Sequence, residues 1–247
     1  MWIGLDGQGQ DLLPSCCRQV KKRVKKGNFL RSQSQDRSNK RTADYACRTT
    51  NLTIVAIIKV VFHSGSGNTK ALAEAVHKGA QAQGDSELLE IVGSQIQEGR
   101  FKDDEFLTKL DQADAIIFGS PTYMGMVSGQ MKAFLDATSS RWMGGTWNSK
   151  LAAGFTTSLG LSGDKQSTLS YLVTVACQHG MIWVSSDAPN SLFSGASMDE
   201  ATNRLSSSTG VMSQVNFGAE FKPSNGDLKT GEMLGARVAK LAAKLAA

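Results

Sequence analysis

The sequence of 247 residues contains only four cysteines and no long hydrophobic run. So few cysteines do not make a disulfide framework, and we therefore expect a reducing compartment, the cytoplasm. A membrane-spanning helix needs about 18 or more consecutive apolar residues, and none is found, so no membrane span is predicted. The adjacent Cys16 and Cys17 lack the spacing and the histidine partners of metal ligands, and no metal site is predicted.

A large charge of one sign is absent from most of the chain. Residues 1–50 contain 11 Lys/Arg and 4 Asp, a net charge of +7, whereas residues 51–247 contain the other 16 basic and 18 acidic residues, a net charge of −2. The near-neutral body argues against a strongly acidic electron carrier that is steered to its partners by charge. We divide the chain into a folded domain over residues 51–247 and a basic extension over residues 1–50.

The extension lacks apolar periodicity, so we expect it to be disordered. It also lacks the apolar region of a signal peptide. Its basic run, Arg18–Lys26, could contact nucleic acid or an anionic membrane surface. For the folded domain, no nucleic-acid binding is expected.

Residues 52–75 predict a strand, a tight turn and a helix. Leu52–Phe62 is almost continuously apolar and β-branched, as in a strand buried on both faces, and helical apolar spacing begins at Thr69. The turn between them is rich in glycine and hydroxyl groups, and the unpaired N–H groups of the helix start favour an anion there. The predicted phosphate-binding residues are Ser64, Gly65, Ser66, Gly67, Asn68 and Thr69.

Two common phosphate loops are excluded. The turn does not contain G-x-x-x-x-G-K-[ST], and Lys70 stands where the third glycine of G-x-G-x-x-G belongs. An ordinary glycine-rich turn before a helix remains the alternative.

Strands and helices alternate from Leu52 onward, which predicts a doubly wound parallel sheet with helices on both faces. The polar segment Ser185–Gly226 contains no clear element, and its length indicates a functional loop or an oligomer contact. The predicted strands are Leu52–Phe62, Glu87–Val92, Ala115–Phe118, Leu151–Thr157 and Met181–Val184, and the predicted helices are Thr69–Gln83, Asp103–Leu110, Gly129–Ala137, Gln166–Gln178 and Leu228–Leu245.

Ligands of such a sheet bind outside the carboxyl ends of its strands. The loops after the third and fourth strands combine small residues, which expose backbone groups, with apolar side chains such as Tyr123 and Met124. We therefore predict that a planar ligand contacts both loops together with the phosphate turn. The residues are Pro121, Thr122, Tyr123, Met124 and Gly125 from the first loop, and Thr157, Ser158, Leu159, Gly160, Leu161 and Ser162 from the second.

The segments F-H-S-G-S-G-N-T-K, I-I-F-G-S-P-T-Y-M-G-M-V-S-G-Q-M-K-A-F-L-D and C-Q-H-G-M resemble the WrbA-type branch of flavodoxin-like FMN proteins. The resemblance covers about Leu52–Leu245. It implies a flavodoxin-like, five-stranded parallel sheet of order 2-1-3-4-5, FMN as cofactor and NAD(P)H as co-substrate. It also implies a quinone or another small redox acceptor, and a homodimer or homotetramer.

The resemblance assigns further roles to single residues. His179 would touch the flavin, and Trp142 would cover the ring from a neighbouring subunit as a substrate-binding residue. Each has a simpler alternative: His179 as a cation at a helix C-terminus, and Trp142 as the cover of a local apolar patch. The chain also departs from the family pattern, because Ser66 replaces a frequent aromatic residue, Tyr123 and Met124 replace an Arg-Phe pair, and Met126 replaces an asparagine.

The predicted function is an FMN-dependent oxidoreductase that passes two electrons from NAD(P)H to a quinone or similar acceptor by a ping-pong mechanism. No catalytic side chain is predicted, since the flavin carries the chemistry. Two alternatives remain, a flavodoxin-type electron carrier and a flavin-free interaction protein on the same fold.

Overall fold

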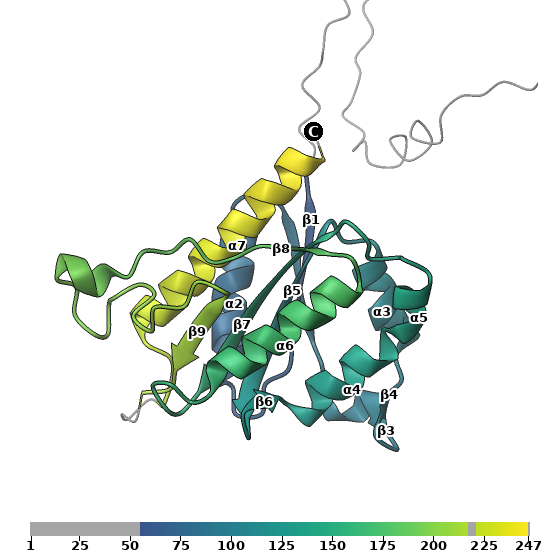
Figure 1. The fold of residues 1–247 in the computed structure, drawn as a ribbon, viewed down its shortest axis with the longest axis horizontal. Helices are drawn as coiled ribbons and strands as arrows, with labels where there is room; N and C mark the ends of the chain where they lie inside the picture. The colour runs from purple at the N-terminus through teal and green to yellow at the C-terminus, as the bar shows by residue number, and fades with distance from the viewer. Residues whose placement is uncertain (1–54, 217–220, 247) are drawn as a thin grey trace, which may run out of the picture. The chain divides into compact units, whose positions relative to one another are not determined.

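The central feature of the fold is a parallel sheet, seen in a computed structural model that describes residues 55–216 and 221–246. Its parallel strands are β1 (Ile57–Phe62), β2 (Asp85–Glu90), β5 (Ala115–Tyr123), β7 (Leu151–Ser158) and β8 (Ile182–Trp183). They lie in the order β2-β1-β5-β7-β8 (Figure 1), which matches the predicted order 2-1-3-4-5 for these five strands. The predicted number of five strands was too small, because two shorter strands also pair with this sheet. The predicted disordered extension, residues 1–50, lies outside the described residues.

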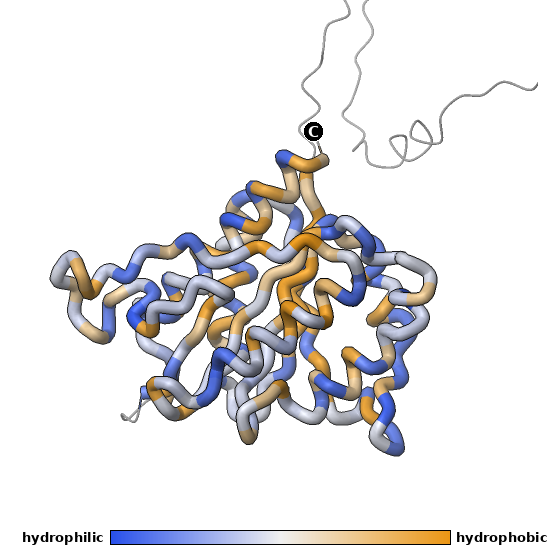
Figure 2. The backbone as a smooth tube through the Cα atoms, viewed as in Figure 1, coloured by the Kyte–Doolittle hydropathy of each residue, from blue (hydrophilic) through white to orange (hydrophobic). Residues whose placement is uncertain are grey.

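Helices cover both faces of the sheet, as predicted (Figure 1). The helices α2 (Asn68–Gln81) and α7 (Asn225–Leu245) contribute to one apolar cluster. The other cluster contains residues of α3 (Asp104–Asp111), α4 (Gly129–Ala137) and α6 (Lys165–Gln178). The apolar colour of Figure 2 is accordingly concentrated on the central strands.

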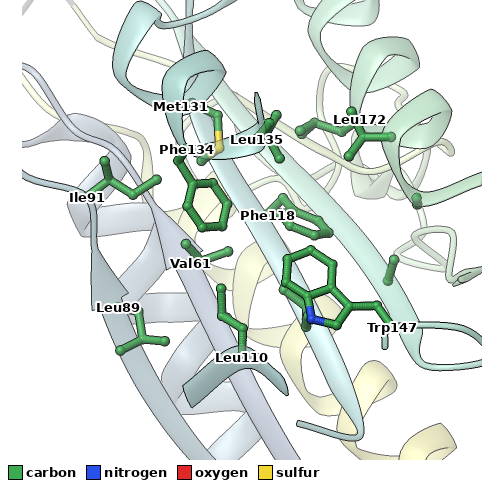
Figure 3. Packing of buried hydrophobic residues seen from close by; sticks show 14 of the residues in the cluster. Val61, Leu89, Ile91, Leu110, Phe118, Met131, Phe134, Leu135, Trp147 and Leu172 are labelled. Carbon is green, nitrogen blue, oxygen red and sulfur yellow. The ribbon is translucent and has the colours of Figure 1, made fainter. Parts of the chain in front are cut away.

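The two clusters follow from the alternation of side chains along each strand. In β1, Val60 and Phe62 belong to the cluster with α2 and α7, whereas Val61 belongs to the opposite cluster. Figure 3 shows Val61 on that side together with Phe118, Phe134 and other buried side chains. This burial on both faces explains why the strand is almost continuously apolar.

Helices α2 and α7 approach each other closely at two glycines. A Cβ atom added to Gly79 would overlap the carbonyl oxygen of Glu232, and one added to Gly235 would overlap the carbonyl oxygen of Val76. The helix backbones therefore touch where a larger side chain would hold them apart, and this contact positions the start of α7 beside the sheet.

The prediction that Ser185–Gly226 contains no element was wrong. Strand β9 (Val211–Gln214) pairs in parallel with the second half of β7, whereas β8 pairs with its first half. The short helix η2 (Ser191–Ser194) lies in the segment between them, which projects beyond the sheet at the left of Figure 1. With four residues, two of them polar, β9 is too short for its periodicity to identify a strand.

Several other short elements were not predicted, and β5 extends through Tyr123 into a segment that we predicted as a loop. They are η1 (Gly93–Gln95), β3 (Ile96–Gln97), β4 (Arg100–Phe101), β6 (Met126–Val127) and α5 (Ser139–Met143).

A buried ion pair connects the segment between β8 and β9 to α7. The Nε and Nη2 atoms of Arg204 each donate to the carboxylate of Asp227 at 2.9 Å, and both side chains are buried. The backbone N–H of Gln214 in β9 donates to the same carboxylate at 3.0 Å. The pair thus joins three segments that are distant in the sequence.

Candidate functional site

The turn between β1 and α2 has the geometry of an anion-binding helix start. Gly67, the residue before the helix, has a φ of +87°, in the left-handed region that favours glycine. The Ser64 hydroxyl oxygen accepts hydrogen bonds from the N–H groups of Gly67 at 3.1 Å and Lys70 at 3.2 Å. The N–H groups of Asn68 and Thr69 have no carbonyl partner within the helix, as at every helix start. The turn therefore offers backbone donors where the helix dipole attracts an anion.

The second predicted loop is a tight hairpin between β5 and β6. Tyr123 pairs with Met126, and the two residues between them, Met124 and Gly125, have φ of +47° and +80°. Two successive residues with positive φ are typical of a type I′ hairpin turn. Met124 is fully exposed at its tip. The hydroxyl of Tyr123 lies against Gly65, because a Cβ atom added to Gly65 would overlap it.

The Thr122 side chain points into the protein rather than toward a ligand. Its hydroxyl forms hydrogen bonds of 2.8 Å with the hydroxyls of Thr156 in β7 and Thr168 in α6. This network fixes the end of β5 against its neighbours, so Thr122 offers a ligand chiefly its backbone.

The third loop, residues 158–164, is built around a buried lysine. The Nζ atom of Lys165 donates to Ser158 Oγ at 2.8 Å and to the carbonyl oxygens of Gly160 at 2.6 Å and Leu161 at 3.0 Å. Lys165 is fully buried, and burial lowers the pKa of its ammonium to about 8. The nearby carboxylate of Asp227 opposes this shift.

These three segments meet at the carboxyl edge of the sheet. Tyr123 touches the phosphate turn, and Gln214 of β9 donates to the carbonyl oxygen of Leu159 in the third loop at 3.2 Å. A Cβ atom added to Gly125 would lie 3.9 Å from the Asp164 side chain, so the second and third loops are also neighbours. With the exception of His179, all predicted cofactor-binding residues therefore lie at this edge.

His179 lies away from the three loops within its own chain. His179 follows the last residue of α6, whose 14 residues span about 21 Å from the third loop to the opposite edge of the sheet. Its ring lies 4.6 Å from that of Trp147, and its Nε2 atom is 2.9 Å from Thr138 Oγ1. Only 6% of His179 is exposed, and burial lowers its pKa. Within one chain His179 therefore packs away from the three loops, and its predicted contact with the flavin, which would require a second copy, stays a prediction.

Trp142 also lies away from the three loops. It belongs to α5, which follows the end of α4 at the amino edge of the sheet, at the right of Figure 1. Its side chain is 54% exposed, and the adjacent Met143 is more exposed still. Within one chain Trp142 does not reach the ligand edge, so a contact with the ring requires a second copy.

Two residues at the ligand edge were missed. Lys165 could have been singled out from the sequence, because a lysine at the first position of a helix is unfavourable with respect to the helix dipole and so suggests a specific role. His63, the residue before the phosphate turn, is buried and its Nδ1 atom has no hydrogen-bond partner within the described residues. Burial lowers the pKa of His63, and the charge of Glu90 opposes this.

The residues at this edge fit the phosphate group of FMN. A Cβ atom added to Gly67 would meet nothing within 4 Å, so the space in front of the helix start is open to a ligand. Exposed Leu159 and Leu161 offer apolar surface beside it. No group of three His, Cys, Asp or Glu side chains that could hold a metal ion occurs in residues 55–216 and 221–246. In the same ranges, no helix is long and apolar enough to cross a membrane.

Comparison with known proteins agrees with this geometry. Residues 58–191 match the family model of the NADPH-dependent FMN reductases. The chain belongs to this family. The matched range contains the phosphate turn and both other loops, whereas β9 and α7 lie beyond it.

Individual members of the wider family are similar over almost their whole length. Flavodoxin FldP of Pseudomonas aeruginosa is 43% identical over 188 residues, which cover 75% of this chain and 96% of that protein. An NAD(P)H dehydrogenase (quinone) of Archaeoglobus fulgidus is 37% identical, over 77% of this chain and 100% of that protein. The crystal structure of a WrbA-like flavodoxin from Agrobacterium tumefaciens is 40% identical, with a TM-score of 0.58 over 76% of this chain and 98% of that one.

Proposed function

We propose that this protein is an FMN-dependent oxidoreductase that passes two electrons from NAD(P)H to a quinone or another small acceptor. The observation that carries the proposal is the meeting of a helix start and two exposed loops at the carboxyl edge of the sheet. The family match and the relatives named NAD(P)H dehydrogenase (quinone) support the same reaction class.

Bound FMN would supply the hydride acceptor and the electron-transfer chemistry. The chain's own residues would bind and orient it. The N–H groups of Asn68 and Thr69 and the exposed Ser66 would bind the phosphate, with the α2 dipole adding to the attraction. Apolar side chains at the loop tips, Met124 and Leu161, would exclude water from the ring.

The exposed side chain of Trp142 supports a contribution from a second copy of the chain. A tryptophan that is half exposed beside an exposed methionine forms an apolar surface that the other described residues leave open. We propose a homodimer or homotetramer in which Trp142 of one subunit covers the site of another. Trp142→Ala should then raise the KM for quinone without changing FMN affinity, and sedimentation should detect an oligomer. A monomer, or an unchanged KM, would contradict this arrangement.

A flavodoxin-type electron carrier is the second candidate, because the relative at 43% identity carries that name. The two functions differ in their use of nicotinamide. An oxidoreductase consumes NADH or NADPH and reduces a quinone, whereas a carrier does not turn over with either.

The test is a steady-state assay of the purified protein saturated with FMN. The oxidation of NADH and of NADPH is followed at 340 nm while benzoquinone is varied. We expect turnover and parallel double-reciprocal lines, because both substrates would use the same face of the ring in turn. Gly67→Val, in which the phosphate turn is altered, serves as the binding-deficient control. Tight FMN binding without turnover on either nicotinamide would favour the carrier.

A further inference from the structure

A buried lysine lies directly beneath the loop that follows β7. Its Nζ atom makes three hydrogen bonds, to Ser158 Oγ and to the carbonyl oxygens of Gly160 and Leu161. Lys165 itself is inaccessible to solvent, whereas the loop residues above it are exposed. The lysine therefore organises the loop from the inside without reaching a ligand.

These hydrogen bonds determine where the loop's N–H groups point. In a planar trans peptide, the C=O and the N–H of the same unit point in opposite directions. The carbonyls of Gly160 and Leu161 point inward to the ammonium, so the N–H groups of Leu161 and Ser162 point outward. Both of these residues are exposed at the ligand edge. The lysine thus turns two backbone donors toward the space where the flavin ring would lie.

The charge of the ammonium is not neutralised by a direct ion pair. None of the described carboxylates forms a salt bridge with Lys165. The charged groups that act on it are Asp227 and Arg204, but these two bind each other as a bidentate pair. A positive charge in a buried environment therefore remains behind the two donors, and charges act more strongly there than in water.

We propose that Lys165 is the positioning residue of the third loop and that it makes the site favour reduced, anionic FMN over oxidised FMN. This inference rests on the proposed function. Outward N–H groups backed by an unpaired positive charge stabilise negative charge that develops on a bound group. Reduction adds two electrons to the ring system, so the preference for the reduced form follows from the arrangement of Lys165.

The test compares three variants of the full chain. Lys165→Met removes both the donors and the charge, whereas Lys165→Arg keeps the charge but cannot gather three acceptors around one atom. Lys150→Met is the matched control: Lys150 also donates to two backbone carbonyls, those of Asp111 and Ala113, but at the amino edge of β7. Circular dichroism and thermal melting verify that each variant is folded. Lys165→Gln, which keeps two donors without the charge, replaces Lys165→Met if the latter does not fold.

Two quantities are measured, the Kd for oxidised FMN by fluorescence titration and the midpoint potential of bound FMN against a reference dye. For Lys165→Met we expect the Kd of oxidised FMN to rise about threefold or more. The Kd of the reduced form should rise about tenfold further, which lowers the two-electron midpoint potential by about 30 mV. Lys165→Gln should lower the potential in the same direction. Lys165→Arg, which keeps the charge but not the hydrogen bonds of the loop, should lower the potential less than Lys165→Met, and Lys150→Met should change neither quantity.

An unchanged potential in folded Lys165→Met or Lys165→Gln would overturn the inference, as would an equal fall in Lys150→Met. In these outcomes the wild-type protein still binds FMN and turns over, so the proposed function stands. A wild-type protein that binds no FMN overturns the proposed function and this inference together.

Discussion

Gly67 provides a direct test of the phosphate turn, because its backbone and its surroundings have a close match elsewhere in the chain. Gly67 has a φ of +87° and Gly195, which follows η2, has a φ of +89°. A Cβ atom added to either would meet nothing within 4 Å. Valine at each position therefore introduces a similar backbone strain, and its Cβ atom overlaps no neighbour. The two sites differ in their place in the fold, because Gly67 precedes α2 whereas Gly195 follows η2.

The expected loss of stability is the same for both variants. An L-residue in the left-handed region costs about 1–2 kcal/mol, and a β-branched residue lies at the upper end. In a domain of this size, each kcal/mol lowers the thermal midpoint by about 2–4 °C. We expect Gly67→Val and Gly195→Val to melt a few degrees below the wild type.

FMN affinity should separate the two variants. The side chain of Gly67→Val would project into the open space in front of α2, where the phosphate is proposed to bind. The side chain of Gly195→Val would project from the segment between β8 and β9, away from that space. The Kd for FMN should rise at least about tenfold for Gly67→Val, or about 1.4 kcal/mol, and remain unchanged for Gly195→Val. Fluorescence titration with FMN measures both. Equal affinities in the two variants would show that the phosphate does not bind at this turn.

Three further predictions concern stability. Gly235→Ala should lower the free energy of unfolding by about 1–3 kcal/mol, because the added methyl group overlaps α2, whereas Gly129→Ala, with open space around its Cβ position, should not; urea titration measures both. Arg204→Ala should cost about 3–5 kcal/mol because it leaves the Asp227 carboxylate buried without its partner, and Arg204→Met combined with Asp227→Leu should recover part of this loss; no recovery would contradict the argument. Burial lowers the pKa of His179 below its ordinary 6.5, so the unfolded chain binds the proton more readily. The stability that depends on this residue should be complete above pH 6.5 and decrease as the pH falls below it, and His179→Gln should flatten that decrease in unfolding titrations at several pH values.

The parts of the fold that were predicted correctly depend on local sequence. A nearly continuous apolar run identifies β1, and the glycine and hydroxyl residues after it identify the turn before α2, because these requirements are met by neighbouring residues. The strand order came from the resemblance, which rests on the same turn and on the segment around Pro121. The domain boundary near residue 50 stays a prediction.

The tertiary structure decided what distant segments do to one another. The motif of His179 predicts a contact with the flavin, and only the length of α6 shows that His179 lies at the opposite edge of its own chain, where it packs on Trp147. Strand β9 has too few residues for a periodic signal and forms because the second half of β7 offers a free edge.

By itself, the sequence determined the alternating strands and helices, the phosphate turn and the two loops of small residues, since each is encoded within a short stretch. Only the tertiary structure decided the role of Lys165. In the sequence it is one of 27 basic residues, and a lysine is normally exposed. Its burial becomes favourable only where the loop carbonyls converge on its ammonium group, and the Asp227 carboxylate that offsets part of the desolvation lies on a helix 62 residues later in the chain (227 − 165 = 62). Such a balance between burial and distant charges has no local signature.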